Sequence, residues 1–206
     1  LTLQMCLINM IYNNFIKRVF DIFLSVMILI LFLPIITILL ILSLIIFSKP
    51  IYTQTRIGKN KERFKIYKIT SLYGKDKNNH DIENKNKHNL YGKLIRNLGL
   101  DELLQILNVI KGEMSLIGPR PLSPDYLKIY NKTQLLRHKI RPGITGLAQV
   151  NRNKITSYNK TFKYDLYYLK KISFKLDLYI FISTFKSIYY NLNNNIKISP
   201  PFNGKN

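Results

Sequence analysis

An uncharged stretch of 26 residues, Ile22 to Phe47, restricts what this chain can fold into more than any other feature. A helix in the core of a small domain seldom exceeds about 20 residues and usually keeps a polar face. A cleaved signal peptide would be shorter and would end in small residues. The stretch and its flanks, residues 17–49, are therefore predicted to form a membrane segment.

Pro34 lies near the middle of this segment, where it removes a backbone donor and predicts a bend. The two arms would each be about 18 to 20 Å long, short of the roughly 30 Å hydrocarbon core. Basic residues flank both ends, so a straight span would export one basic cluster against the usual positive-inside bias. A re-entrant helix-break-helix with both ends on one face is favoured, and a single kinked span is the alternative.

The two ends of the chain are less informative. Residues 1–16 are interpreted as a leader in which Met10 is the preferred start, and residues 191–206 as a polar C-terminal tail. Cys6 has no cysteine partner and the three histidines are scattered, so neither a disulfide nor a zinc site is expected. One folded domain is predicted between these parts, over residues 50–190.

The net charge of +21 indicates a polyanionic partner. Nucleic acid, an anionic membrane face and phosphate-bearing substrates would all satisfy it. A helix-turn-helix pattern and an aromatic RNA-binding motif are both absent from the sequence, so nucleic acid is the least favoured of the three.

Short elements follow the membrane segment, and the predicted fold class is α/β, mostly helical. Alternating apolar residues predict strands at Ile51–Thr55 and Phe64–Ile69. Helical spacing predicts a helix that starts near Asp101 and stops by Gly112. From Ser157 to Tyr190, aromatic residues and lysines interleave at helical spacing. This pattern suits amphipathic helices on a headgroup surface, with ordinary core packing as the alternative.

Two carboxylates, Asp101 and Glu102, lie at the start of a predicted helix, where free N–H groups favour anions. A capping pair is the plainer interpretation. The same pair could hold Mg²⁺, or one carboxylate could attack phosphorus and form an acyl phosphate.

Three arginines lie in loops that could surround this pair. Arg96 precedes it, Arg120 stands between two prolines, and Arg141 opens a glycine-rich loop that allows close backbone approach. A guanidinium binds phosphate oxygens through two parallel donors, so the three together could clamp a pyrophosphate. For the loops that contain Arg120 and Arg141, simple structural turns are the alternative.

These features combine into a recognisable pattern. The sequence resembles the bacterial sugar transferase family of monotopic phosphoglycosyl transferases from Lys17 to Tyr190. The resemblance is carried by Lys17–Asp21, Phe64–Lys68, Leu100–Gln105, Lys111–Pro121 and Arg137–Asn151.

The resemblance implies a re-entrant helix in the bacterial inner (cytoplasmic) membrane, with the catalytic domain on the cytoplasmic face. It implies that Asp101 attacks the β-phosphate of a UDP-sugar and releases UMP, after which undecaprenyl phosphate accepts the sugar phosphate. Glu102 would be the second acid, and the two acids would also hold Mg²⁺. The implied substrate-binding residues are Arg96, Arg120, Arg141, Lys68 and Gln149.

The sugar is less constrained by the sequence. The compact size and the closing residues Phe202–Asn206 most resemble the branch of the family that uses UDP-N,N'-diacetylbacillosamine in protein glycosylation. Another UDP-hexose or UDP-N-acetylhexosamine, for capsule, exopolysaccharide or O-antigen synthesis, is the alternative. Departures from the family pattern at Thr70, Leu147 and Arg152 also leave open an inactive membrane scaffold. Anionic lipids and other glycan-assembly enzymes are further expected partners.

Overall fold

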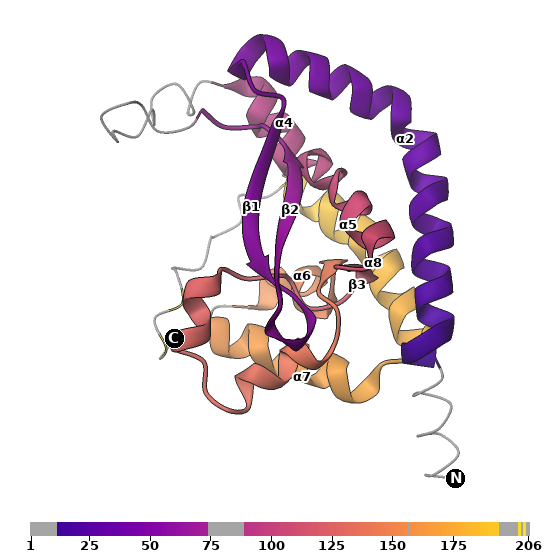
Figure 1. The fold of residues 1–206 in the computed structure, drawn as a ribbon, viewed down its shortest axis with the longest axis vertical. Coiled ribbons are helices and arrows are strands. Elements are labelled where there is room, and N and C mark those ends of the chain that lie inside the picture. Colours follow the sequence, from indigo (N-terminus) through magenta and orange to yellow (C-terminus); the bar gives the residue numbers. More distant parts are fainter. Residues whose placement is uncertain (1–11, 74–88, 156, 194–201, 203, 205–206) are drawn as a thin grey trace.

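The computed structural model describes residues 12–73, 89–155, 157–193, 202 and 204. The protein is mostly helical with two small sheets, which confirms the predicted α/β, mostly helical class. A long, bent N-terminal helix lies along two sides of the domain (Figure 1). A β-hairpin, short central helices and turns, a second two-stranded pair and two C-terminal helices form the domain itself. The predicted leader lies largely outside the described residues. Of the predicted C-terminal tail, the structure describes residues 191–193, Phe202 and Gly204.

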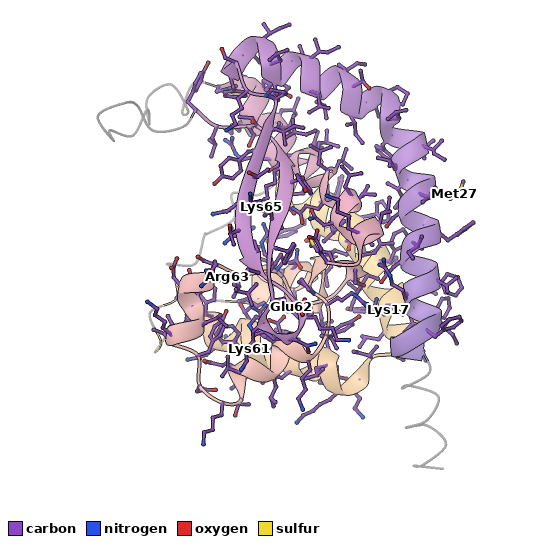
Figure 2. The ribbon with its side chains drawn as sticks, viewed as in Figure 1. Lys17, Met27, Lys61, Glu62, Arg63 and Lys65 are labelled. Carbon is purple, nitrogen blue, oxygen red and sulfur yellow. The ribbon has the colours of Figure 1, made fainter. Side chains whose placement is uncertain are left out.

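Helix α2 (Lys17–Phe47) contains the uncharged stretch and continues through Pro34. Figure 1 shows that it bends near its middle, so that its two arms lie along two sides of the domain. Most of its apolar side chains are exposed, with Leu31 at 72%. Met27 points away from the domain and Lys17 toward it (Figure 2). Among the described residues, α2 is the one helix long and apolar enough to cross a membrane.

Both arms of α2 are bonded to the same domain. In the first arm, Lys17 Nζ lies 2.8 Å from the Asp177 carboxylate, and the Asp21 carboxylate accepts from Ser115 Oγ at 2.7 Å. In the second arm, Ser43 Oγ donates to the Thr70 carbonyl at 2.8 Å. These bonds satisfy polar groups on the inner face of an otherwise apolar helix and fix its position.

Two two-stranded sheets follow. Strands β1 (Ile51–Ile57) and β2 (Arg63–Ile69) pair antiparallel and confirm the two predicted strands, each slightly longer than expected. Strand β3 (Ser115–Ile117) pairs in parallel with β4 (Gly143–Thr145). The β3–β4 pair brings together the two glycine- and proline-containing loops that the sequence marked as candidate phosphate sites.

The segment around the two acids differs from the prediction. Helix α4 (Leu90–Asn97) ends before Gly99, whose left-handed φ of 71° turns the chain. The acids then lie in a single 3-10 turn, η3 (Leu100–Glu102), and α5 (Gln105–Lys111) starts only afterwards. The predicted helix start at Asp101 is therefore wrong, because the tight turn that follows Gly99 comes first. The predicted stop is confirmed, since Gly112 ends α5 with a φ of 93°.

The C-terminal pattern divides into two helices with different environments. Helix α7 (Tyr158–Lys171) buries Phe162 and Tyr168, so core packing accounts for these two aromatic residues, whereas Tyr167 is exposed. Helix α8 (Phe174–Asn193) instead exposes a large apolar face. The exposed large apolar side chains are Phe174, Leu178, Tyr179, Phe181, Ile182, Phe185, Tyr189 and Tyr190.

Candidate active site

A buried asparagine positions the two elements that form the site. Asn108 of α5 is fully buried; its side chain donates to the Lys65 carbonyl at 2.7 Å and accepts from the Tyr67 amide at 3.2 Å. These bonds fix α5 against the edge of β2. As a result, Lys68, one residue further along β2, reaches the turn η3 that precedes α5.

Glu102 is held by two cations. Its Oε1 atom lies 2.6 Å from Lys68 Nζ and 2.7 Å from Arg120 Nη2. Burial acts to raise the pKa of this carboxyl, but Arg120 and Lys68 outweigh burial and lower it to about 2. Glu102 is thus a fixed anion that orients both cations.

Asp101, the neighbouring residue, is in a different state. Asp101 is only 8% exposed. No residue in the described part of the chain donates a hydrogen bond to its carboxylate. Burial raises its pKa to about 6, with a further increase from Glu102, while Lys68, Arg120 and Arg96 act in the opposite direction. Asp101 is therefore a mostly ionised, desolvated carboxylate at neutral pH, which is the state of an available nucleophile.

A cavity of about 400 Å³ opens in front of the two acids. Lys68, Arg96 and Arg120 line it together with Asp101 and Glu102. Arg96 also donates from Nη1 to the Ser71 carbonyl, which fixes its position. Other lining residues come from the end of α4, from the turn after it and from α6 (Leu147–Val150), η6 (Arg152–Lys154) and α8; they include Gln149, Arg152, Thr184 and Ser187.

Arg141 lies elsewhere. Its Nε donates to the Gly112 carbonyl at 2.9 Å, and its side chain lines a narrow separate cavity with Lys17 and Arg18. Arg141 precedes β4, whereas Gln149 follows it, so the two lie at opposite ends of the strand. The structure therefore brings together Lys68, Arg96, Arg120 and Gln149 around the acids, but not Arg141.

Close backbone contact between the two glycine-containing loops positions Arg120 and Gln149. A Cβ atom on Gly146 would lie 2.1 Å from the Gly118 carbonyl oxygen, and one on Gly143 would lie 2.0 Å from the Gly118 nitrogen. Any side chain at these positions would force the loops apart. The glycines therefore allow the two loops to pack against each other.

Two further cavities adjoin the first. One, of about 160 Å³, is almost entirely apolar and is lined by Ile28 of α2 and by Phe181 and Phe185 of α8, together with Gly99 and Glu102. The other, of about 340 Å³, contains arginine and tyrosine side chains and shares Arg120, Gln149 and Arg152 with the acidic cavity.

The sequence did not single out Asn108 or Arg56 as site residues. Arg152 was noted only as a departure from the family pattern. Arg56 carries no clear sequence signal, because alternation along β1 places it on the same face as Gln54; the structure shows that this face is half-buried. No signal marks Asn108 either, because the two backbone partners that fix α5 against β2 lie 41 and 43 residues away.

Comparison with known proteins identifies the family. The model of the bacterial sugar transferase family matches residues 12–191. The uncharacterized sugar transferase EpsL of Bacillus subtilis is 39% identical over 142 residues, covering 68% of this chain and 70% of EpsL. The chain therefore belongs to the bacterial sugar transferase family and is an enzyme of the transferase class.

Two other relatives carry more specific names. The UDP-glucose:undecaprenyl-phosphate glucose-1-phosphate transferase of Klebsiella pneumoniae is 36% identical over 87% of this chain. The UDP-N-acetylgalactosamine-undecaprenyl-phosphate N-acetylgalactosaminephosphotransferase of Aeromonas hydrophila is 35% identical over 84% of it. The chain spans 40% and 44% of the length of these two relatives.

Proposed function

We propose that this protein transfers a sugar 1-phosphate from a UDP-sugar to undecaprenyl phosphate and releases UMP. The observation that carries the proposal is the unbonded, buried carboxylate of Asp101, which faces a cavity lined by Lys68, Arg96 and Arg120. The names of the Klebsiella and Aeromonas relatives describe this reaction with two different sugars.

In the first step, a carboxylate oxygen of Asp101 attacks the β-phosphorus of the donor. The bond from that phosphorus to the bridging oxygen breaks, and UMP leaves with the electron pair. The sugar phosphate stays on Asp101 as an acyl phosphate. Arg96, Arg120 and Lys68 stabilise the charge that develops on the phosphoryl oxygens and the leaving group.

In the second step, a phosphate oxygen of undecaprenyl phosphate attacks the same phosphorus. The acyl phosphate bond breaks, Asp101 becomes a carboxylate again, and the lipid carries the sugar diphosphate. Glu102 keeps its charge throughout, because its pKa of about 2 prevents it from acting as a base near neutral pH. Its role is to orient Lys68 and Arg120.

The carboxylates also fit the proposed Mg²⁺. This ion is commonly bound through one or two carboxylates together with substrate phosphates. Asp101 has a free carboxylate, whereas Glu102 already binds two cations through Oε1, so Asp101 is the better ligand and Glu102 the poorer one. When bound, Mg²⁺ would neutralise the diphosphate and its leaving group.

A lipid acceptor accounts for the apolar cavity. It lies between α2 and α8, and it reaches Glu102 at the edge of the acidic cavity. An isoprenoid chain could enter from the membrane beside Ile28, with its phosphate directed toward Asp101. The exposed apolar faces of α2 and α8 would then both contact lipid.

The bonds at both ends of α2 support re-entrant placement in the bacterial inner membrane. A straight helix of 31 residues would be about 46 Å long and would place its ends on opposite faces. Lys17 and Ser43 instead bind the same domain, which we place on the cytoplasmic face as a catalytic unit of residues 50–190.

For the donor we propose UDP-N,N'-diacetylbacillosamine and a role in protein glycosylation. Another UDP-hexose or UDP-N-acetylhexosamine, in polysaccharide synthesis, is the alternative. Anionic lipids and other glycan-assembly enzymes are the further proposed partners, and the first of these fits the net charge of +21.

Nucleotide exchange without acceptor tests the reaction. Membranes that contain the protein should incorporate labelled UMP into a UDP-sugar when Mg²⁺ is present and undecaprenyl phosphate is absent. Asp101→Asn should abolish this exchange. A panel of UDP-sugars in the same assay identifies the donor. Release of UDP instead of UMP in the full reaction would refute the proposal.

Cysteine labelling tests the topology. With Cys6 replaced by serine, Ile16→Cys and Ser48→Cys place single thiols at exposed positions near the two ends of α2. Both should resist an impermeant maleimide in intact cells and react after permeabilisation. Labelling of one position alone in intact cells would indicate a kinked span.

A further inference from the structure

The cavity next to the acidic one contains arginines that lack a compensating acid. Arg56, Arg120, Arg137 and Arg152 line it, and among the residues that the structure describes no aspartate or glutamate does. Arg137 is neutralised by Asp165 at 2.8 Å, with both side chains 2% exposed, and Arg120 binds Glu102. Arg56 and Arg152 form no ion pair within the described chain, so they give the cavity an excess of positive charge.

Arg56 has unsatisfied hydrogen-bonding capacity. Its Nη2 donates to Gln54 Oε1 at 2.6 Å, but its Nε is buried without a partner. Burial, and then Arg120, lower the pKa of Arg56, and the same two causes lower the pKa of Arg152. Cations that are partly desolvated and repel one another are destabilising unless an anion joins them.

Tyrosine rings form another wall of this cavity. Tyr126 and Tyr158 both line it, with ring centroids 6.0 Å apart and ring planes at 74°. Phe202 packs behind them, 5.8 Å from the Tyr126 ring and 5.6 Å from the Tyr158 ring. The two tyrosines are therefore held in place, and Ser123 and Thr161 also line the cavity. Fixed aromatic rings and hydroxyls suit a planar base attached to a ribose.

The cavity adjoins the acidic one, and Arg120, Gln149 and Arg152 line both of them. A ligand with its reacting phosphorus at Asp101 could therefore extend past Arg120 into the arginine and tyrosine cavity. The apolar cavity shares a different set of lining residues with the acidic one: Gly99, Glu102, Ile144, Thr145 and Thr184. Its lining does not include Arg120, Gln149 or Arg152. Donor and acceptor thus have separate approaches to the acids.

We propose that the cavity between Arg56 and Tyr158 binds the nucleoside monophosphate portion of the donor. Arg56 and Arg152 bind the phosphate that leaves, and the tyrosines contact the base. This inference rests on the proposed function and adds the subsite for the leaving nucleotide.

Direct titration with UMP tests the subsite without turnover. Calorimetry on the full chain in lipid nanodiscs at pH 8 would give dissociation constants for UMP and for ribose 5-phosphate, which lacks the base. Arg56→Gln should weaken both ligands about tenfold. Tyr158→Ala should weaken UMP alone, and Tyr158→Phe should restore it. Arg63→Gln, an exposed arginine on the same hairpin, is the matched control and should change neither.

The outcomes separate this inference from the proposed function. Equal UMP affinity in wild type, Arg56→Gln and Tyr158→Ala, or no UMP binding to wild type, would refute the subsite. If UMP is nevertheless released during turnover, the proposed reaction stands. A loss of ribose 5-phosphate binding equal to that of UMP in Tyr158→Ala would refute the contact to the base. Thermal unfolding of each variant identifies any that fail to fold.

Discussion

Asp101 and Glu102 are neighbours in one 3-10 turn, yet the pKa of Asp101 is raised to about 6 while that of Glu102 is lowered to about 2. Burial acts on both carboxyls in the same direction. The difference arises because Lys68 and Arg120 bond directly to Glu102, whereas Asp101 has no such partner among the described residues. The turn thus separates a fixed structural anion from a carboxylate free to react.

The rate of the first half-reaction should depend on the ionisation of Asp101. Since only the carboxylate attacks, kcat/KM for the UDP-sugar should be constant above about pH 7 and fall tenfold per pH unit well below pH 6. Glu102→Gln should move the inflection to lower pH, because it removes a charge that raises the pKa of Asp101. A profile of wild type that stays flat from pH 8 to pH 5 would contradict this assignment.

Asp101→Asn should stabilise the fold while it abolishes turnover. The folded carboxyl keeps its proton to about pH 6, whereas the unfolded one releases it near 3.8, so the native state loses stability as pH rises across this interval. The difference corresponds to about 3 kcal/mol at pH 7. Thermal unfolding should show a higher Tm for the variant at pH 7.5 and nearly equal values at pH 4. An equal or lower Tm at pH 7.5 would count against a buried, ionised Asp101.

Asp177 should be a major determinant of how α2 attaches to the domain. Its carboxylate accepts from Lys17 Nζ at 2.8 Å, from Tyr12 at 2.8 Å and from Tyr168 at 2.6 Å. Asp177→Ala removes the closer of the two carboxylates at the buried Lys17 ammonium and leaves only Asp21, at 3.9 Å. Breaking a buried ion pair generally costs up to about 3 to 5 kcal/mol. We expect a markedly lower Tm in detergent. Lys175→Ala, an exposed residue on the same helix, should change it little.

Phe202 should support the aromatic wall of the nucleotide subsite. Its ring lies 5.1 Å from Phe162 as well as close to both tyrosines, and the residue is 4% exposed. Phe202→Ala should cost about 3 kcal/mol of stability and raise KM for the UDP-sugar more than it lowers kcat. Tyr167→Ala, at an exposed position of α7, is the control. An unchanged KM in a folded Phe202→Ala protein would show that the wall does not depend on this ring.

The sequence was sufficient for features that depend on local composition. The uncharged stretch predicted a long apolar helix, alternation predicted β1 and β2, and a glycine predicted the end of α5. Sequence patterns predicted less well the features that depend on how distant segments pack. The helix start at Asp101 was wrong because Gly99 turns the chain, and Arg141 lies outside the acidic cavity because β4 separates it from Gln149.

The sequence by itself determined the family, the acidic pair and the glycines that let two loops pack together, because each depends on residue type and spacing along the chain. Only the tertiary structure decided which acid is free and which cations surround it. The bond from Lys68 to Glu102 joins residues 34 positions apart, and that from Arg120 joins residues 18 apart. The burial that raises the pKa of Asp101 likewise exists only after α4, β2 and the Arg120 loop have packed around the turn.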